Sequence, residues 1–95
     1  MSQLQELFTI ICQRRDAPRP DSYTSQLFQR GEDQVLKKIG EEAIEIIVAA
    51  KGQGDQRLIE EVADLTYHML VLLAMRGLSL ADVEAELRRR HQARQ

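Results

Sequence analysis

Two acidic clusters interrupt an otherwise apolar stretch of the sequence, and this stretch constrains the fold more than any other part of the chain. The clusters read Glu41-Glu42-Ala-Ile-Glu45 and Glu60-Glu61-Val-Ala-Asp64. An α-helix turns by about 100° per residue, so acids three positions apart lie about 60° from each other on one face. Each cluster therefore presents two carboxylates together, Glu42 with Glu45 and Glu61 with Asp64.

These acidic faces border the apolar stripes of their helices. The first stripe consists of Val35, Ile39, Ala43, Ile46 and Ala50. The segment from Ile59 to Ala74 is apolar nearly all round apart from its acids and His68, which is typical of a buried helix. Converging carboxylates taken out of water need cations to balance them, so we predict a metal site. Hard oxygen ligands select Mg²⁺, Mn²⁺ or Ca²⁺.

The simpler interpretation of the acids is a pair of solvated faces that form ion pairs along one helix, such as Lys38 with Glu42. The positions of the acids relative to the turn between the two helices favour a shared site instead. Glu42 and Glu45 lie eleven and eight residues before Gln53, and Glu61 and Asp64 lie eight and eleven residues after it. Two antiparallel helices joined at this turn would bring both acid pairs to the same height.

The hydrophobic periodicity predicts an all-α fold for a single domain, residues 1–95, built on two long antiparallel helices. These helices are expected from Asp33 to Lys51 and from Gln56 to Met75, with Asp55 capping the second. Because a chain of 95 residues buries only a modest core, we expect the bundle to be completed by forming a homodimer or a higher homo-oligomer.

Shorter helices are predicted on either side of this pair. The first runs from Ser2 to Arg14 and ends before two prolines. A second follows Ser22, whose hydroxyl caps it or helps to bind phosphate, and Gly31 ends it. A last helix opens with a capping box from Ser79 to Asp82, continues through Leu87, and frays into a basic tail from Arg88 to Arg94.

Composition excludes several classes of protein. The formal charge is −2 and the basic tail is too small a footprint for nucleic acid, so no nucleic-acid partner is expected. The longest apolar run, Met69 to Met75, is too short to span a membrane. The one cysteine, Cys12, lies in an apolar helical stretch and is expected to be a buried thiol. A cytoplasmic protein is predicted.

The acidic signature resembles that of the all-α, MazG-like nucleotide pyrophosphohydrolases. More narrowly, the chain resembles the phosphoribosyl-ATP pyrophosphohydrolase family, which acts in histidine biosynthesis. The resemblance covers roughly residues 22–73 and rests on four blocks, which are Ser22-Tyr-Thr, Leu27-Phe-Gln-Arg-Gly31, Lys37-Lys-Ile-Gly-Glu-Glu42, and Ala63-Asp-Leu-Thr-Tyr-His68 with Val71-Leu-Leu. Thr66 stands where a bulkier apolar residue is expected, and no acid departs from the pattern.

This resemblance implies Mg²⁺-dependent hydrolysis of the α,β-phosphoanhydride of phosphoribosyl-ATP, giving phosphoribosyl-AMP and pyrophosphate. It implies metal ligands at Glu42, Glu45, Glu61 and Asp64, with Glu41 as a further catalytic residue that acts as a base or behind the ligands. The substrate would contact Ser22, Tyr23, Thr24, Arg30, Lys37 and Lys38. For Lys38, an ion pair with Glu42 stays an equal alternative, and for His68 a structural role is favoured over direct metal binding.

Two other functions stay open from the sequence alone. One is a pyrophosphohydrolase that removes non-standard nucleoside triphosphates, which shares the acid signature but not the Ser22 block. The other is a helical protein-interaction module without catalytic activity, whose acids only keep it soluble. Metal dependence separates the enzymes from the module, and the preferred triphosphate separates the two enzymes.

Overall fold

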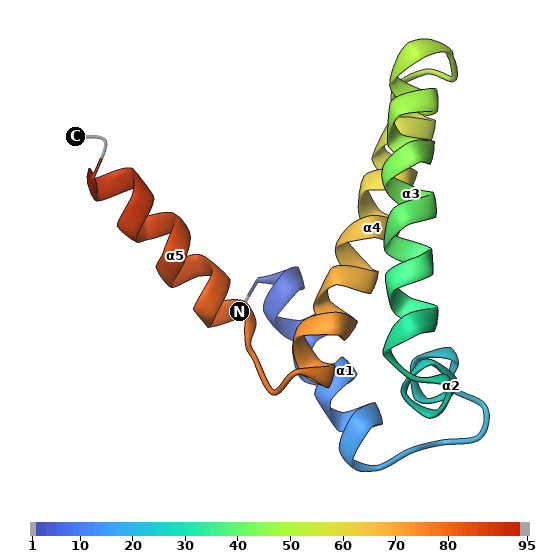
Figure 1. Cartoon of the computed structure of the whole chain (residues 1–95), viewed down its shortest axis with the longest axis vertical. Helices are drawn as coiled ribbons and strands as arrows, with labels where there is room; N and C mark the ends of the chain where they lie inside the picture. Colours follow the sequence, from blue (N-terminus) through green and yellow to red (C-terminus); the bar gives the residue numbers. More distant parts are fainter. Residues whose placement is uncertain (1, 94–95) are drawn as a thin grey trace.

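The computed structural model describes residues 2–93, and this part of the chain forms five α-helices and no strand. Figure 1 shows their arrangement. The helices are α1 (Gln3–Asp16), α2 (Tyr23–Arg30), α3 (Glu32–Gly52), α4 (Asp55–Met75) and α5 (Leu80–Ala93). The predicted all-α class is therefore confirmed.

Helices α3 and α4 form the long axis of the molecule and lie side by side, α4 running back along α3 (Figure 1). A turn at Gln53 and Gly54 joins them, and Gly54 has a φ of 87°, a left-handed value that glycine adopts without strain. The prediction that Asp55 caps α4 is wrong. Gly54 occupies the cap position, and Asp55 is the first helical residue, where its charge still favours the positive end of the helix dipole.

Side-chain caps start all three shorter helices. At α1 the Ser2 hydroxyl accepts a hydrogen bond from the N–H of Gln5 at 3.2 Å, and the Gln5 side chain accepts from the N–H of Ser2 at 2.9 Å. The Ser22 hydroxyl oxygen accepts a hydrogen bond from the backbone N–H of Ser25, 3.1 Å away, at the start of α2. The capping box before α5 is confirmed. The Ser79 hydroxyl accepts from the N–H of Asp82 at 3.2 Å, and the Asp82 carboxylate accepts from the N–H of Ser79 at 2.8 Å.

Helix α5 is longer than predicted, because it continues past Leu87 to Ala93. Two arginines in this segment, Arg89 and Arg90, form ion pairs with Glu86 one turn earlier, and such pairs support a helix where the sequence suggested fraying. None of the α5 residues is buried, and the helix projects away from α3 and α4 (Figure 1). Arg94, counted in the basic tail, lies outside the described residues.

The hydrophobic core lies where α1 and α2 pack against the beginning of α3 and the end of α4. Its fully buried members are Ile11, Leu27, Val35, Leu70, Val71 and Ala74. Arg15 reinforces this end by donating to the Ala74 carbonyl oxygen at 2.9 Å, and Arg76 forms an ion pair with Glu32. Cys12 packs against the core but is only half-buried, so the expectation of a buried thiol is not met in full.

The halves of α3 and α4 nearest their turn lie beyond this core. Ile47 is 64 % exposed and Ile59 is 61 % exposed, and Val62 is also exposed. Within one chain, the predicted burial of Ile59 to Ala74 therefore holds for the end of α4 and for Glu61, but not for Ile59 and Val62. In residues 2–93 no helix is both long enough and apolar enough to cross a membrane.

Candidate active site

The two acids on α3 and α4 that face the partner helix are buried. Glu42 is 7 % exposed and Glu61 is 1 % exposed, although both are charged residue types. Their helices place Glu42 near Asp64 and Glu45 near Glu61, which is the pairing that their equal distances from the turn predict. The structure therefore brings the four predicted metal ligands into one electrostatic cluster.

Glu42 contacts a buried histidine. Its Oε1 atom lies 2.8 Å from Nδ1 of His68, which is itself 5 % exposed. Burial raises the pKa of Glu42, and the neighbouring His68 and the charge of Lys38 only partly offset this rise. Asp64 adds to the rise because its negative charge disfavours a second one nearby.

Glu61 forms an ion pair with Arg57, one turn earlier on α4. Its pKa is raised, first by the neighbouring carboxyl group of Glu45, and then by burial and by the charges of Glu45 and Asp64. Arg57 opposes the rise, and it also binds Glu60 at 3.0 Å. Two acidic side chains with raised pKa values at one place are typical of a functional site.

Three buried carboxylate oxygens lack a well-aligned hydrogen bond within residues 2–93. They are Oε1 of Glu42, which Nδ1 of His68 approaches, and both oxygens of Glu61, of which Oε1 forms the ion pair with Arg57. Buried polar atoms are rarely left in this condition, and a cation would satisfy them. In this part of the chain, no three acidic, histidine or cysteine side chains converge on one point as metal ligands do. Glu45 and Asp64 are exposed, however, and can change rotamer.

The remaining predicted acid, Glu41, lies on the outside of α3. It is exposed and makes no ion pair or hydrogen bond within the described chain. Glu41 is adjacent to Glu42 in sequence but points about 100° away from it on the helix, so the structure does not bring it into contact with the other four acids.

The hydroxyls of the Ser22-Tyr23-Thr24 block bind protein groups. The Ser22 hydroxyl caps α2, the Tyr23 hydroxyl lies 3.2 Å from Nε2 of His68, and the Thr24 hydroxyl lies 2.5 Å from the hydroxyl of Tyr67. The Tyr23 and Tyr67 rings stack, with centroids 6.2 Å apart. The block therefore anchors α2 to α4 beside the acids. The sequence had suggested only helix capping and phosphate binding for these hydroxyls.

The predicted phosphate-binding cations are available in the structure. Arg30 and Lys37 are exposed, Lys38 is half-buried, and none of the three forms an ion pair within residues 2–93. Lys38 nevertheless lies near enough to Glu42 for its charge to lower the pKa of that carboxyl. The alternative of a direct Lys38–Glu42 ion pair is thus not what the structure shows.

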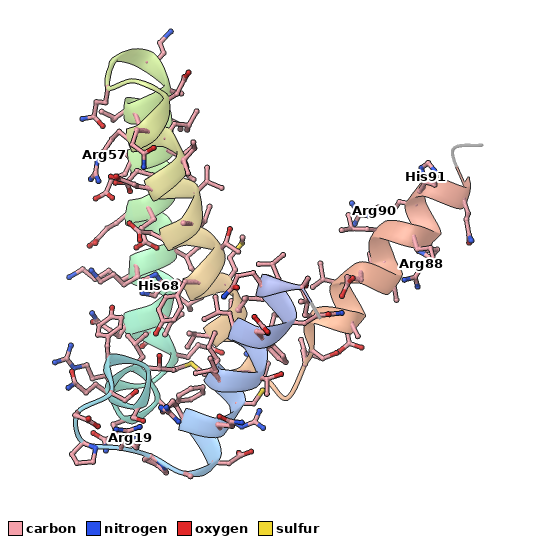
Figure 2. All side chains as sticks on the ribbon, turned by 180° about the vertical axis from the view of Figure 1, so that it is seen from behind. Arg19, Arg57, His68, Arg88, Arg90 and His91 are labelled. Carbon is pink, nitrogen blue, oxygen red and sulfur yellow. The ribbon has the colours of Figure 1, made fainter. Side chains whose placement is uncertain are left out.

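Sequence reasoning missed Arg57, which is the cation closest to the buried Glu61. The spacing of Arg57 to Glu60 and Glu61, three and four residues, is the ordinary spacing of ion pairs along a helix and could have revealed it. Figure 2 shows Arg57 near the α3–α4 turn, with His68 further along α4 on the same side.

Comparison with known proteins agrees with this geometry. The family model described as "Phosphoribosyl-ATP pyrophosphohydrolase" matches residues 4–91. A protein from Lactiplantibacillus plantarum is 50 % identical over 90 residues, which cover 95 % of this chain and 85 % of that protein. One from Pelotomaculum thermopropionicum is 52 % identical over 89 residues, covering 94 % and 91 %. Both relatives are named phosphoribosyl-ATP pyrophosphatase. The chain belongs to the phosphoribosyl-ATP pyrophosphohydrolase family.

Proposed function

We propose that this chain hydrolyses phosphoribosyl-ATP to phosphoribosyl-AMP and pyrophosphate, the second step of histidine biosynthesis, at the acid cluster between α3 and α4. The names of relatives about half identical to it, covering most of its length, support this activity. The observation that carries the proposal is the pair of buried acids, Glu42 and Glu61, whose pKa values are both raised. An acidic residue that only kept the protein soluble would lie on the surface.

The residues present fit a divalent cation. Glu42, Glu45, Glu61 and Asp64 would hold Mg²⁺, or Mn²⁺, because hard cations prefer carboxylate oxygens and three buried oxygens lack an aligned partner. Such a cation, when bound, neutralises phosphate charge and lowers the pKa of a coordinated water. The four carboxylates supply the negative charge that attracts the cation, and Arg57 compensates part of that charge without it.

Other residues of the chain would bind and orient the substrate. Arg30, Lys37 and Lys38 would contact phosphate oxygens and stabilise the charge that develops on the leaving pyrophosphate. Free backbone N–H groups at the start of α2, after Ser22, favour an anion there as well. Glu41, exposed and unpaired in the described chain, is proposed as the residue that accepts or relays the proton of the attacking water.

The central experiment measures pyrophosphate release from phosphoribosyl-ATP and from ordinary and non-standard nucleoside triphosphates, with and without Mg²⁺. We expect that, among these substrates, the protein hydrolyses phosphoribosyl-ATP and not the other triphosphates, and that it does so only when Mg²⁺ is present. A preference for non-standard triphosphates would support the nucleotide-cleaning alternative, and no turnover of any of them would favour the interaction module. Glu61→Gln should abolish activity, whereas Glu60→Gln, its exposed neighbour, is the matched control and should retain it.

We also propose that two copies associate through the exposed apolar side of α3 and α4. On α3 this side carries Leu36, Gly40, Ala43, Ile47 and Ala50, and on α4 it carries Ile59, Val62, Thr66, Met69 and Leu73. Both sets follow alternating steps of three and four residues, the spacing that packs one helix against another in bundles. This pattern supports a homodimer in which the two α3–α4 pairs form a four-helix bundle.

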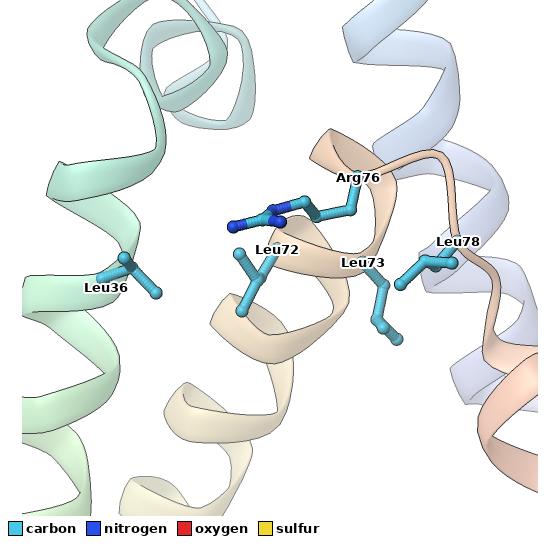
Figure 3. A pocket seen from close by; sticks show the side chains of 5 residues that line it. All are labelled: Leu36, Leu72, Leu73, Arg76 and Leu78. Carbon is cyan, nitrogen blue, oxygen red and sulfur yellow. The ribbon is translucent and has the colours of Figure 1, made fainter. Parts of the chain in front are cut away.

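A pocket next to this side, between the start of α3 and the end of α4, supports the same proposal. The pocket, of about 260 Å³, is lined by Leu36, Leu72, Leu73, Arg76 and Leu78. Figure 3 shows these side chains. Its walls are almost entirely leucine, so a leucine or isoleucine from a second copy would fit it better than water or a polar ligand. We also propose that the protein is cytoplasmic, as the sequence predicts.

A further inference from the structure

Three side chains from three helices form a connected line beside the acid cluster. The Tyr23 hydroxyl of α2 lies 3.2 Å from Nε2 of His68 on α4, and Nδ1 of the same ring lies 2.8 Å from Oε1 of Glu42 on α3. The middle residue is buried, with 5 % of its surface exposed. The line joins the start of α2, where phosphate is proposed to bind, to one of the proposed metal ligands.

The atoms around His68 determine where its ring proton sits. Nδ1 lies near two oxygens that can only accept hydrogen bonds, the carboxylate of Glu42 and the backbone carbonyl of Asp64 at 3.0 Å. These two acceptors favour a proton on Nδ1. In the neutral ring Nε2 is then the acceptor, so the Tyr23 hydroxyl donates to it, and each group in the line has one defined role.

We propose that Tyr23 and His68 are positioning residues that hold Glu42 in the orientation needed to bind the cation. The His68 ring, whose Nδ1–H bonds to the Asp64 carbonyl, lies 2.8 Å from Oε1 of Glu42 and limits how that carboxylate can turn. Tyr23 keeps the His68 ring in the required tautomer by donating to Nε2. Partners that orient a ligand in this way commonly change metal affinity by about 10- to 100-fold when they are removed.

The surrounding rings restrict the movement of this line. Tyr67 packs edge-on against His68 with centroids 4.9 Å apart and stacks on Tyr23. Its own hydroxyl bonds to Thr24 and does not touch the imidazole nitrogens. Tyr67 thus fixes ring positions. Of the two tyrosines, Tyr23 is the one that hydrogen-bonds to His68, and this difference makes Tyr67 a suitable control.

The inference rests on the proposed metal site, and its first test needs neither metal nor substrate. Long-range ¹H–¹⁵N NMR of the metal-free protein reports which imidazole nitrogen carries the proton. The chain has two histidines, so His91→Gln assigns the His68 signals. We expect the Nδ1–H form in wild type and in Tyr67→Phe, and a larger share of the Nε2–H form in Tyr23→Phe. A wild-type ring in the Nε2–H form would overturn the inference.

The second test measures the Mg²⁺ concentration that gives half-maximal thermal stabilisation. Tyr23→Phe should raise this concentration by about 10-fold, while Tyr67→Phe should leave it near the wild-type value. His68→Asn keeps a donor at the Nδ1 position and should bind Mg²⁺ better than His68→Leu. In the His68→Asn background, Tyr23→Phe should have no further effect.

These outcomes distinguish failure of the inference from failure of the proposed function. Equal losses of Mg²⁺ affinity in Tyr23→Phe and Tyr67→Phe would show that the two hydroxyls act only by joining α2 to α4, and the positioning role would be wrong. A protein that shows the expected tautomer and the expected Mg²⁺ shifts, yet does not hydrolyse phosphoribosyl-ATP, would refute the proposed activity and leave the positioning role standing.

Discussion

Replacing Ile47 with alanine gives the sharpest test of the proposed dimer. Ile47 is 64 % exposed in the single chain, at the middle of the apolar side of α3. A buried CH₂-sized group contributes about 0.8 kcal/mol, so the three carbons lost in Ile47→Ala are worth about 2.4 kcal/mol when fully buried. Only the exposed 64 % of the side chain can become buried on dimerisation, so the lost burial energy is about 1.5 kcal/mol for each copy.

A two-fold dimer contains this side chain twice, so Ile47→Ala should weaken association by about 3 kcal/mol, which is a rise in Kd of roughly 100-fold. Alanine has the higher helix propensity, so the monomer should not lose helix. Analytical ultracentrifugation over a concentration series from nanomolar to micromolar would measure both Kd values.

Val48→Ala is the matched control for this experiment. Val48 is the next residue of α3 and is also exposed, 49 % of its surface, but it lies about 100° round the helix from Ile47 and outside the apolar side defined above. The control should leave Kd close to the wild-type value. The reasoning fails if Val48→Ala weakens association as much as Ile47→Ala, or if the wild-type chain is monomeric at micromolar concentration.

Three further predictions concern the acid cluster. Glu45→Gln should raise the melting temperature of the metal-free protein, because the substitution removes repulsion with Glu61. Mg²⁺ should no longer stabilise this variant. A lower melting temperature of the metal-free variant would contradict the prediction. The pKa values of Glu42 and Glu61 are raised in the folded state, so the folded protein holds protons that the unfolded chain releases near 4.5, and metal-free stability should fall as pH rises above that value. Thermal melts in chelator across pH would show this fall, and saturating Mg²⁺ should flatten it. Arg57→Gln should lower the Mg²⁺ concentration that gives half-maximal thermal stabilisation, since the arginine competes with the cation for Glu61. Arg89→Gln on α5 is the control and should leave this concentration unchanged. An unchanged concentration in Arg57→Gln would exclude such competition.

Periodicity and turn residues were enough to predict the helices, because local rules govern them. The turn at Gly54 and the capping box of Ser79 and Asp82 each involve only a few consecutive residues, so both can be recognised in the sequence. The end of α5 was missed, since ion pairs from Glu86 extend a helix that the apolar pattern alone would end. Which apolar faces are buried also could not be predicted, because Ile59 looks the same in sequence whether its neighbour is its own chain or another copy.

The same distinction between local and distant contacts applies to the site. The counts of residues from the turn predicted which acids meet, because α3 and α4 are consecutive and straight. The partners of Tyr23 and Thr24 could not be inferred, since they are 45 and 43 residues away in sequence and meet only once α2 folds against α4. Arg57 was missed for a different reason. Its ion pair is local, but surface pairs of this spacing are common and rarely mark a site.

Helix α5 has a consequence for how the protein unfolds. Fourteen residues with none buried, packed mainly against α1, resemble an isolated peptide helix, and such helices are only marginally stable in water. Its amides should exchange with solvent by local opening at a free energy near zero, long before the amides around Val71 and Leu27, which open only with the whole core. The cooperative folding unit is therefore α1 to α4. A protein domain fused after α5 would be carried on a segment that can unfold and refold without disturbing the acid cluster.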